Sequence, residues 1–251
     1  MQLAGCPLIV PALDKPLINA KAAFSICALV LTAAAAAYSQ TTIFNITSAD
    51  TLDKDTVNIE ADFLTKPVHY RNGGYQTYGY RLAYGLNNKT EIGSNFYLTW
   101  DGRRSVADIE FSLKRRLYGN KKLGLLFASG VTAFVPLRDT TGDRTSFMVY
   151  ANGAKTFKKT HGTQFTGGVY RLLRGQRSLG TRTGAMLALV QPVHPRLNAV
   201  IDWFSGDNRF GYVSAGFTFF VTKRQYLTAG YSFGNSGRGN NALAVYYGII
   251  Y

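Results

Sequence analysis

Residues 75–86 read YQTYGYRLAYGL and residues 90–101 read TEIGSNFYLTWD, and these two stretches decide the fold. Successive side chains of a β-strand point to opposite faces, so every second residue shares a face. One face of the first stretch carries Tyr78, Tyr80, Leu82, Tyr84 and Leu86, and the other carries Thr77, Gly79, Arg81, Ala83 and Gly85. The residues between the stretches, Asn87-Asn88-Lys89, are typical of a tight turn, because Asn tolerates positive φ. The two stretches therefore predict an antiparallel hairpin with one apolar and one polar face.

The same period-two alternation recurs along the chain after Gln40 and predicts twelve strands. Their expected bounds are 56–66, 75–86, 90–101, 105–117, 122–136, 145–157, 163–173, 181–191, 196–205, 210–221, 225–234 and 241–251. The segments between them are rich in Gly, Asn and Asp, as in SGDN at 205–208 and GNSGRGN at 234–240. Such residues favour turns, so the pattern predicts an all-β protein whose strands run antiparallel.

Three features favour a transmembrane up-and-down β-barrel over a soluble β-sandwich. The expected strands are longer than the usual five or six residues of soluble sheets, and they suffice for a tilted membrane crossing. Their second face is polar rather than apolar, so it does not require a partner sheet. The apolar faces end in aromatic residues, namely Tyr84, Trp100, Trp203, Tyr231, Phe233, Tyr247 and Tyr251. Aromatic rings suit the membrane–water interface, so we expect a barrel of twelve strands, with ten or fourteen as alternatives.

The N-terminus has the pattern of an export signal. Residues 22–37 read AAFSICALVLTAAAAA and follow Lys15 and Lys21, which gives an apolar core behind a basic segment. The small residues Ala37 and Ser39 predict cleavage after Ser39; cleavage after Ala37 and an uncleaved anchor are the alternatives. We therefore expect a signal peptide at 1–39, a periplasmic segment at 40–55 and the barrel at 56–251. Both cysteines lie within the expected signal, which leaves the barrel without disulfides or Cys metal sites.

The last expected strand alternates strictly and ends in an aromatic residue, Tyr251. This strand resembles the C-terminal signature by which the barrel-assembly machinery recognises Gram-negative outer-membrane proteins. The stretches TTIFNITSAD (41–50) and DWFSGDNRFGYVSAGF (202–217) are also similar to those of small Gram-negative outer-membrane barrels described as porin-like or transporter-like. The resemblance implies an integral outer-membrane protein with Tyr251 as its assembly signal, and it assigns no other functional residue.

The charge of the chain indicates an anionic partner. There are 28 Lys and Arg residues against 14 Asp and Glu residues, a formal net charge of +14. Many of the basic residues fall in expected turns and loops, among them Arg103, Arg104, Arg138, Lys122 and Arg209. Arg at a barrel rim suits the phosphates of outer-membrane lipids and lipopolysaccharide, although charges that only mark the barrel ends give the same pattern. No basic groove or helix predicts nucleic-acid binding.

The candidate site is the set of charged residues on the polar faces, because a charge at membrane depth must face a water-filled or internally paired lumen. These residues are Glu60, Asp62, Arg81, Asp108, Glu110 and Lys114. A barrel of twelve tilted strands leaves a passage of about 10 Å at most, and single charges strongly affect so narrow a pore. We expect these residues to line a charged constriction. The alternative is a structural network in which the acids only pair with Arg81 and Lys114.

Catalysis finds little support in the sequence. The three histidines, His69, His161 and His194, fall in expected turns or loops, and no Ser-containing motif stands beside His69, the one nearest the outer rim. No phosphate-binding loop and no metal-spaced cluster of ligands is apparent, so we expect no cofactor. The sequence favours a small passive pore for small polar or charged solutes. A blocked-lumen structural or adhesion barrel is the main alternative, and a membrane-embedded enzyme is a weaker one.

Overall fold

The computed structural model describes residues 42–138, 144–174, 180–235, 237 and 241–251. These residues form a closed antiparallel barrel of twelve strands, which confirms the predicted fold class. The strands are β1 (Val57–Lys66), β2 (Tyr75–Asn87), β3 (Thr90–Trp100), β4 (Ser105–Asn120), β5 (Leu125–Pro136), β6 (Ser146–Phe157), β7 (Thr163–Arg174), β8 (Thr183–His194), β9 (Leu197–Phe204), β10 (Tyr212–Phe220), β11 (Gln225–Gly234) and β12 (Ala242–Ile250). The expected signal peptide lies outside the described residues.

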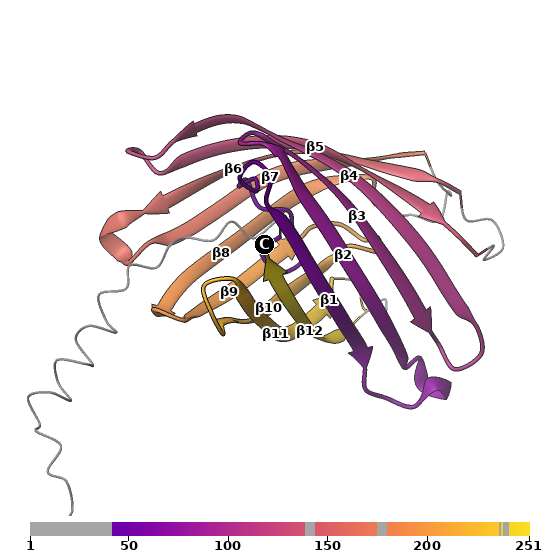
Figure 1. Cartoon of the computed structure of the whole chain (residues 1–251). Coiled ribbons are helices and arrows are strands. Elements are labelled where there is room, and N and C mark those ends of the chain that lie inside the picture. The colour runs from indigo at the N-terminus through magenta and orange to yellow at the C-terminus, as the bar shows by residue number, and fades with distance from the viewer. Residues whose placement is uncertain (1–41, 139–143, 175–179, 236, 238–240) are drawn as a thin grey trace, which may run out of the picture. The chain divides into compact units, whose positions relative to one another are not determined.

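The strands follow one another around the barrel, and β12 returns to pair with β1 (Figure 1). At this seam the N–H of Val57 donates to the carbonyl of Tyr251 (3.1 Å), and the N–H of Tyr251 donates to the carbonyl of Val57 (2.8 Å). Closure leaves no strand edge unpaired, as a sheet in lipid requires. Both residues lie at the barrel end that carries the short turns at 88–89, 121–124, 158–162, 195–196 and 221–224. We call this end the short-turn end and the opposite one the loop end.

Two 3-10 helices, η1 (Tyr70–Asn72) and η2 (Lys158–Thr160), lie in connections between strands. The chain reverses after η2 at His161, whose φ of 56° falls in the left-handed region. Within the described ranges, no helix is long and apolar enough to cross a membrane.

The strand alternation directs the side chains as the sequence predicts. Outward-facing Leu82, Phe111 and Phe217 are 49%, 51% and 56% exposed. Inward-facing Glu60 and Lys114, by contrast, are only 4% and 2% exposed. So much exposed apolar surface is unusual for a soluble protein and is typical of the lipid-facing side of a membrane barrel.

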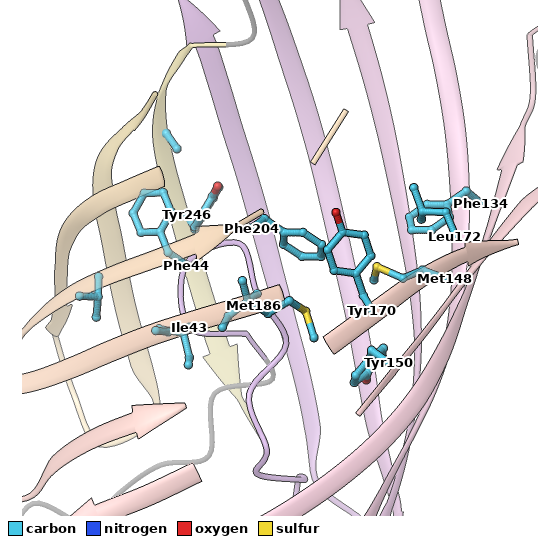
Figure 2. Packing of buried hydrophobic residues seen from close by; sticks show 14 residues of the cluster. Ile43, Phe44, Phe134, Met148, Tyr150, Tyr170, Leu172, Met186, Phe204 and Tyr246 are labelled. Carbon is cyan, nitrogen blue, oxygen red and sulfur yellow. The ribbon is translucent and has the colours of Figure 1, made fainter. Parts of the chain in front are cut away.

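The lumen is filled differently on its two sides. Strands β1–β4 turn charged and hydroxyl-bearing side chains inward, and we call them the polar wall. Strands β5–β9 form the apolar wall, whose buried apolar cluster is Phe134, Met148, Tyr150, Tyr170, Leu172, Met186, Ala188, Val200 and Phe204. The same strands also bury a few polar side chains, namely Thr132, Ser146, Asn152, Thr166 and Asp202. Figure 2 shows Tyr170 beside Phe204, and their ring centroids lie 4.6 Å apart. The remaining strands, β10–β12, turn many small residues inward, among them Ser214, Gly216, Gly230 and Ser232.

Candidate functional site in the barrel lumen

Arg81 on β2 is the centre of the first charge cluster on the polar wall. The register places Arg81 directly opposite Glu60 on β1, and Asp62 is the next inward residue of that strand. Arg81 Nη1 lies 3.2 Å from Glu60 Oε1, and Arg81 Nε lies 2.6 Å from Asp62 Oδ2. One cation therefore compensates two neighbouring carboxylates, and the cluster keeps a negative formal charge.

A glycine makes room for the aromatic ring that completes this cluster. Tyr97 on β3 lies opposite Gly79 on β2, and a Cβ at Gly79 would come within 2.4 Å of the Tyr97 ring. In this notch the Tyr97 hydroxyl accepts a hydrogen bond from Arg81 Nε (2.7 Å) and donates one to Asp62 Oδ2 (3.2 Å). Gly79 therefore acts as a packing site that holds Tyr97 against the ion pair.

The second acidic pair, Asp108 and Glu110 on β4, faces a cation from the loop between β9 and β10. The guanidinium group of Arg209 lies 3.6 Å from Glu110 Oε1 and 3.9 Å from Asp108 Oδ2. It also lies 4.7 Å from the ring centre of Phe134 and 4.8 Å from that of Phe210, within cation–π range. The sequence pattern predicts Arg209 at the barrel rim, whereas two carboxylates and two aromatic rings direct its side chain toward the lumen.

Lys114 on β4 pairs with Glu91, which the sequence pattern did not connect with it. The register places Glu91 on β3 directly across from Lys114, and the Nζ–Oε1 distance is 3.1 Å. Glu110 instead accepts a hydrogen bond from Asn95 Nδ2 at 2.8 Å, in addition to its contact with Arg209. Glu110 and Lys114 lie on the same strand and do not pair with each other. Each pairs instead with a residue of a neighbouring strand or loop.

Residues 42–52, which come before β1, lie against the inside of the barrel, and we call them the lumen segment. Phe44 and Ile46 are fully buried and belong to the same cluster as the apolar wall. Figure 2 shows Phe44 beside Tyr246 of β12, with their ring centroids 5.4 Å apart. The sequence assigned residues 40–55 to a periplasmic segment ahead of the barrel, and that expectation did not include these contacts.

The first part of the lumen segment is a tight turn, residues 42–47, which we call the lumen turn. Thr42 and Thr47 form a bridge, and the N–H of Ile43 donates to the carbonyl of Ile46 (2.9 Å). The backbone N–H groups of three consecutive residues, 44–46, donate to Oδ2 of Asp202 on β9, at 3.2, 2.5 and 2.9 Å. Asp202 is 1% exposed. The turn thus wraps three amide dipoles around one buried carboxylate, as in other backbone anion nests.

The lumen turn also contacts strands on other sides of the barrel. Arg81 Nη1 of β2 donates to Thr42 Oγ1 (3.1 Å), and Asn152 Nδ2 of β6 donates to the carbonyl of Thr47 (2.6 Å). The side chain of Asn45 bonds to Ser214, to Ser232 and to the hydroxyl of Tyr246, on β10, β11 and β12. With Asp202 on β9, these contacts come from six strands, so the turn spans the interior rather than lining one wall.

Beside the lumen turn, a cavity of about 290 Å³ lies between the polar wall and the apolar wall, whose Phe134, Met148, Tyr150 and Phe204 belong to its lining. On β3 it is lined by four successive inward positions, Glu91, Gly93, Asn95 and Tyr97. The six residue-to-residue steps from Glu91 to Tyr97, at roughly 3.4 Å each, make the lined stretch about 20 Å long. Thr42, Asn45 and Thr47 of the lumen turn border the same cavity. A space of this size holds several water molecules, and β3 and β4 supply the charged residues Glu91, Glu110 and Lys114 to its lining.

The described lumen groups carry a negative charge although the whole chain is basic. Among the ion-paired groups described above together with Asp202, six carboxylates face three cations, which gives this set a formal charge of −3 when all are ionised. The carboxylates are Glu60, Asp62, Glu91, Asp108, Glu110 and Asp202, and the cations are Arg81, Lys114 and Arg209. The chain as a whole has a formal charge of +14, so the basic excess lies outside this set.

The remaining residues singled out in the sequence lie away from this interior. His69, His161 and His194 are exposed in connections or at a strand end. Tyr251 is 63% exposed at the seam, where its backbone pairs with Val57. The part of the chain that the structure describes holds no group of three or more His, Cys, Asp or Glu residues placed to bind a metal ion.

Comparison with known proteins reveals a likeness of fold. No family model matches the chain, and neither does any curated protein sequence. The solved KdgM porin, in complex with disordered oligogalacturonate, aligns with a TM-score of 0.52 and 7% identity over 78% of this chain and 98% of the porin. The COG4313 outer membrane channel from Pseudomonas putida F1 aligns with a TM-score of 0.49 and 14% identity, over 81% of this chain and 98% of the channel. Outer membrane phospholipase A from Escherichia coli aligns with a TM-score of 0.48 and 12% identity, over 79% of this chain and 93% of the phospholipase. The likeness to the porin shows that the chain has the fold of an outer-membrane β-barrel, as the sequence resemblance implied.

Proposed function

We propose that the chain is a passive pore of the bacterial outer membrane for small polar or charged solutes. The observation that carries this proposal is the cavity of about 290 Å³, whose lining combines the charged side chains of Arg81, Glu110 and Lys114 with apolar residues such as Phe134 and Met148. Because the described lumen groups carry a formal charge of −3, the pore should prefer cations. Narrow low-dielectric walls strengthen such a preference.

Conductance of the purified full chain in planar bilayers tests the proposal. We expect small steps with cation selectivity in a salt gradient. Replacing Glu60 and Glu110 with Gln lowers the negative charge of the lumen, so the reversal potential should shift toward anions. Two exposed acids at the short-turn end, Asp53 and Asp55, provide the matched control, because Asp53→Asn with Asp55→Asn removes as much charge outside the cavity. If the Glu60→Gln, Glu110→Gln variant melts at a lower temperature but keeps the selectivity of the wild type, the two acids belong to a structural network and do not set the selectivity.

The second candidate function is a blocked-lumen structural or adhesion barrel. The lumen turn favours it, because the turn bonds to six strands and occupies the interior. Electrical silence, together with vesicles that stay impermeable to small sugars, would support this function over a pore.

The surroundings of the barrel follow from the same proposal. Outer-membrane lipids and lipopolysaccharide would contact the apolar outer face and basic rim residues such as Arg103 and Arg104, and the barrel-assembly machinery would insert the chain. We expect no catalytic activity, because the exposed histidines stand apart from the lumen acids. An assay for ester hydrolysis on phospholipid micelles, with activity above a boiled control, would contradict this expectation.

A further inference from the structure

We propose that the lumen wall around Asp202 is a docking site for a peptide turn and that it holds residues 42–47 as a displaceable plug. The effect on solute flow rests on the proposed pore function. The docking itself can be measured without any flow, so the two proposals can fail separately.

The anchor of the docking site is a single charged oxygen. Asp202 Oδ2 accepts three backbone N–H groups in a row, from Phe44, Asn45 and Ile46. Hydrogen bonds to a carboxylate are about twice as strong as bonds between neutral groups. Backbone donors exist in every sequence, so this contact recognises the shape of the turn rather than its side chains.

Specificity for this turn comes from the fit of its two central side chains. Gly216 on β10 lies opposite Gly230 on β11, and a Cβ at either would come within 2.9 or 2.8 Å of the Phe44 ring. The glycine pair therefore leaves a shallow notch in which Phe44 is fully buried. Next to it, the Ser214 and Ser232 hydroxyls, 2.8 Å apart, both accept from the Asn45 amide.

The turn can leave without breaking the sheet. The barrel is closed by pairing of its own twelve strands, and the hydrogen bonds described between the turn and the barrel all use barrel side chains. Thr42, Asn45 and Thr47 are part of the cavity wall. Release of the turn would therefore join the space it fills to the cavity and widen the passage.

The first test reads the position of the turn by thiol labelling in detergent. The reporter is Ile43→Cys, in a full chain whose native thiols are removed by Cys6→Ala and Cys27→Ala. Adding Asp202→Asn should raise the rate of maleimide labelling by about tenfold or more, since a loss of 1.4 kcal/mol in docking suffices for that factor. The matched control is Thr218→Val, which removes a buried hydroxyl of β10 that bonds to Thr228 and not to the turn. An unchanged labelling rate in folded Asp202→Asn protein would overturn the docking site.

The second test supplies the turn from outside, and it also covers an Asp202→Asn variant that fails to fold. In the full chain, residues 43–46 are replaced with Gly-Ser-Gly-Ser while Asp202 is kept. We expect this variant to conduct more than the wild type, and we expect the synthetic peptide TTIFNITSAD to lower its conductance while a scrambled peptide does not. Equal conductance, or no response to the peptide, would overturn the plug. Silence of every variant combined with faster labelling of Asp202→Asn would overturn the pore and leave the docking site standing.

Discussion

The polar wall and the apolar wall are made of the same kind of strand, yet they fill the interior in opposite ways. On the apolar wall, Tyr170, Leu172 and Met186 are at most 2% exposed and pack like the core of a soluble protein. On the polar wall, the ion pairs of Arg81 and Lys114 leave a cavity of about 290 Å³ beside them. From this contrast it follows that the cavity has a charged side, along β3 and β4, and an apolar side, so any route for solutes passes between the two walls.

Both walls depend on the seam that closes the barrel, and its loss should have the largest effect. Deleting Tyr251 removes the backbone pair with Val57, so we expect most of the folded protein to disappear from the outer membrane. Heat-modifiable migration of membrane fractions measures the folded amount. Tyr251→Asp should also lower it, whereas Tyr251→Phe keeps an aromatic ring and should not. Normal amounts after the deletion would mean that Tyr251 is only an interface aromatic.

Truncating the apolar wall should cost more stability than truncating the lipid-facing side. The ring of Tyr170 packs against that of Phe204 at an angle of 55°, and its hydroxyl donates a hydrogen bond to the carbonyl of Ser205 at 2.5 Å. Tyr170→Ala should therefore lower the free energy of unfolding by about 3–5 kcal/mol, measured by urea unfolding in lipid vesicles. Leu187→Ala, on the outer face of the neighbouring strand, is the control and should have a much smaller effect. Equal losses of unfolding free energy in the Tyr170→Ala and Leu187→Ala variants would contradict a tightly packed apolar wall.

The polar wall should respond to charge balance rather than to volume. Lys114→Met leaves the buried Glu91 carboxylate without its cation, and we expect a loss of about 3 kcal/mol. Adding Glu91→Gln removes the uncompensated charge and keeps an oxygen that can accept the N–H of Leu52, now 2.9 Å from Glu91 Oε2. The double variant should regain most of the loss in the same unfolding assay. A double variant as unstable as the single one would show that packing, not charge, governs this wall.

The smallest expected effect lies at the loop end of the polar wall. Hydrogen bonds from the backbone N–H groups of Arg104 and Arg103 lower the pKa of Asp101 below the ordinary value for Asp. Because the folded-state pKa is the lower one, the stabilisation is present above the ordinary pKa and is lost as pH falls through the lowered value. A carboxyl NMR titration in micelles should place the pKa of Asp101 below the ordinary value for Asp. Titration of Asp101 at the ordinary value would contradict the turn geometry.

Strand positions and lumen-facing residues were predictable because both follow from a period of two. Alternation alone turns Arg81 inward, and once β1 and β2 are in register it lies directly opposite the inward residue Glu60. The pairing of Lys114 with Glu91 follows from register in the same way, and exact cross-strand alignment of β3 and β4 would have found it. Alternation predicts the face to which each side chain points. This is sufficient to predict a contact wherever the partner residue also lies on a strand.

Arg209 and the lumen segment could not be predicted in this way, because neither lies on a strand. A loop residue has no face assigned by periodicity, so Arg209 was grouped with the rim cations. The lumen segment has too short an apolar pattern, Ile43, Phe44 and Ile46, to suggest burial before the barrel begins. One available signal was Asp202, an inward acid whose cross-strand neighbours are Ala188 and Ser214 rather than a cation. A carboxylate in that position needs donors from elsewhere in the chain.

The contact between the lumen turn and Asp202 also has a consequence for the order of folding. It joins residues 156 to 158 positions apart, and the Asn45 amide reaches 187 positions along the chain to Ser232. Contacts between such distant residues carry a high entropic cost of loop closure, so we expect them to form late. The described hydrogen-bond partners of residues 44–46 on the barrel lie on β9–β12, so this part of the docking site does not exist until the last strands are in place. We therefore expect docking of the lumen turn to be the last step of folding, so a docked turn would indicate that the barrel around it is complete.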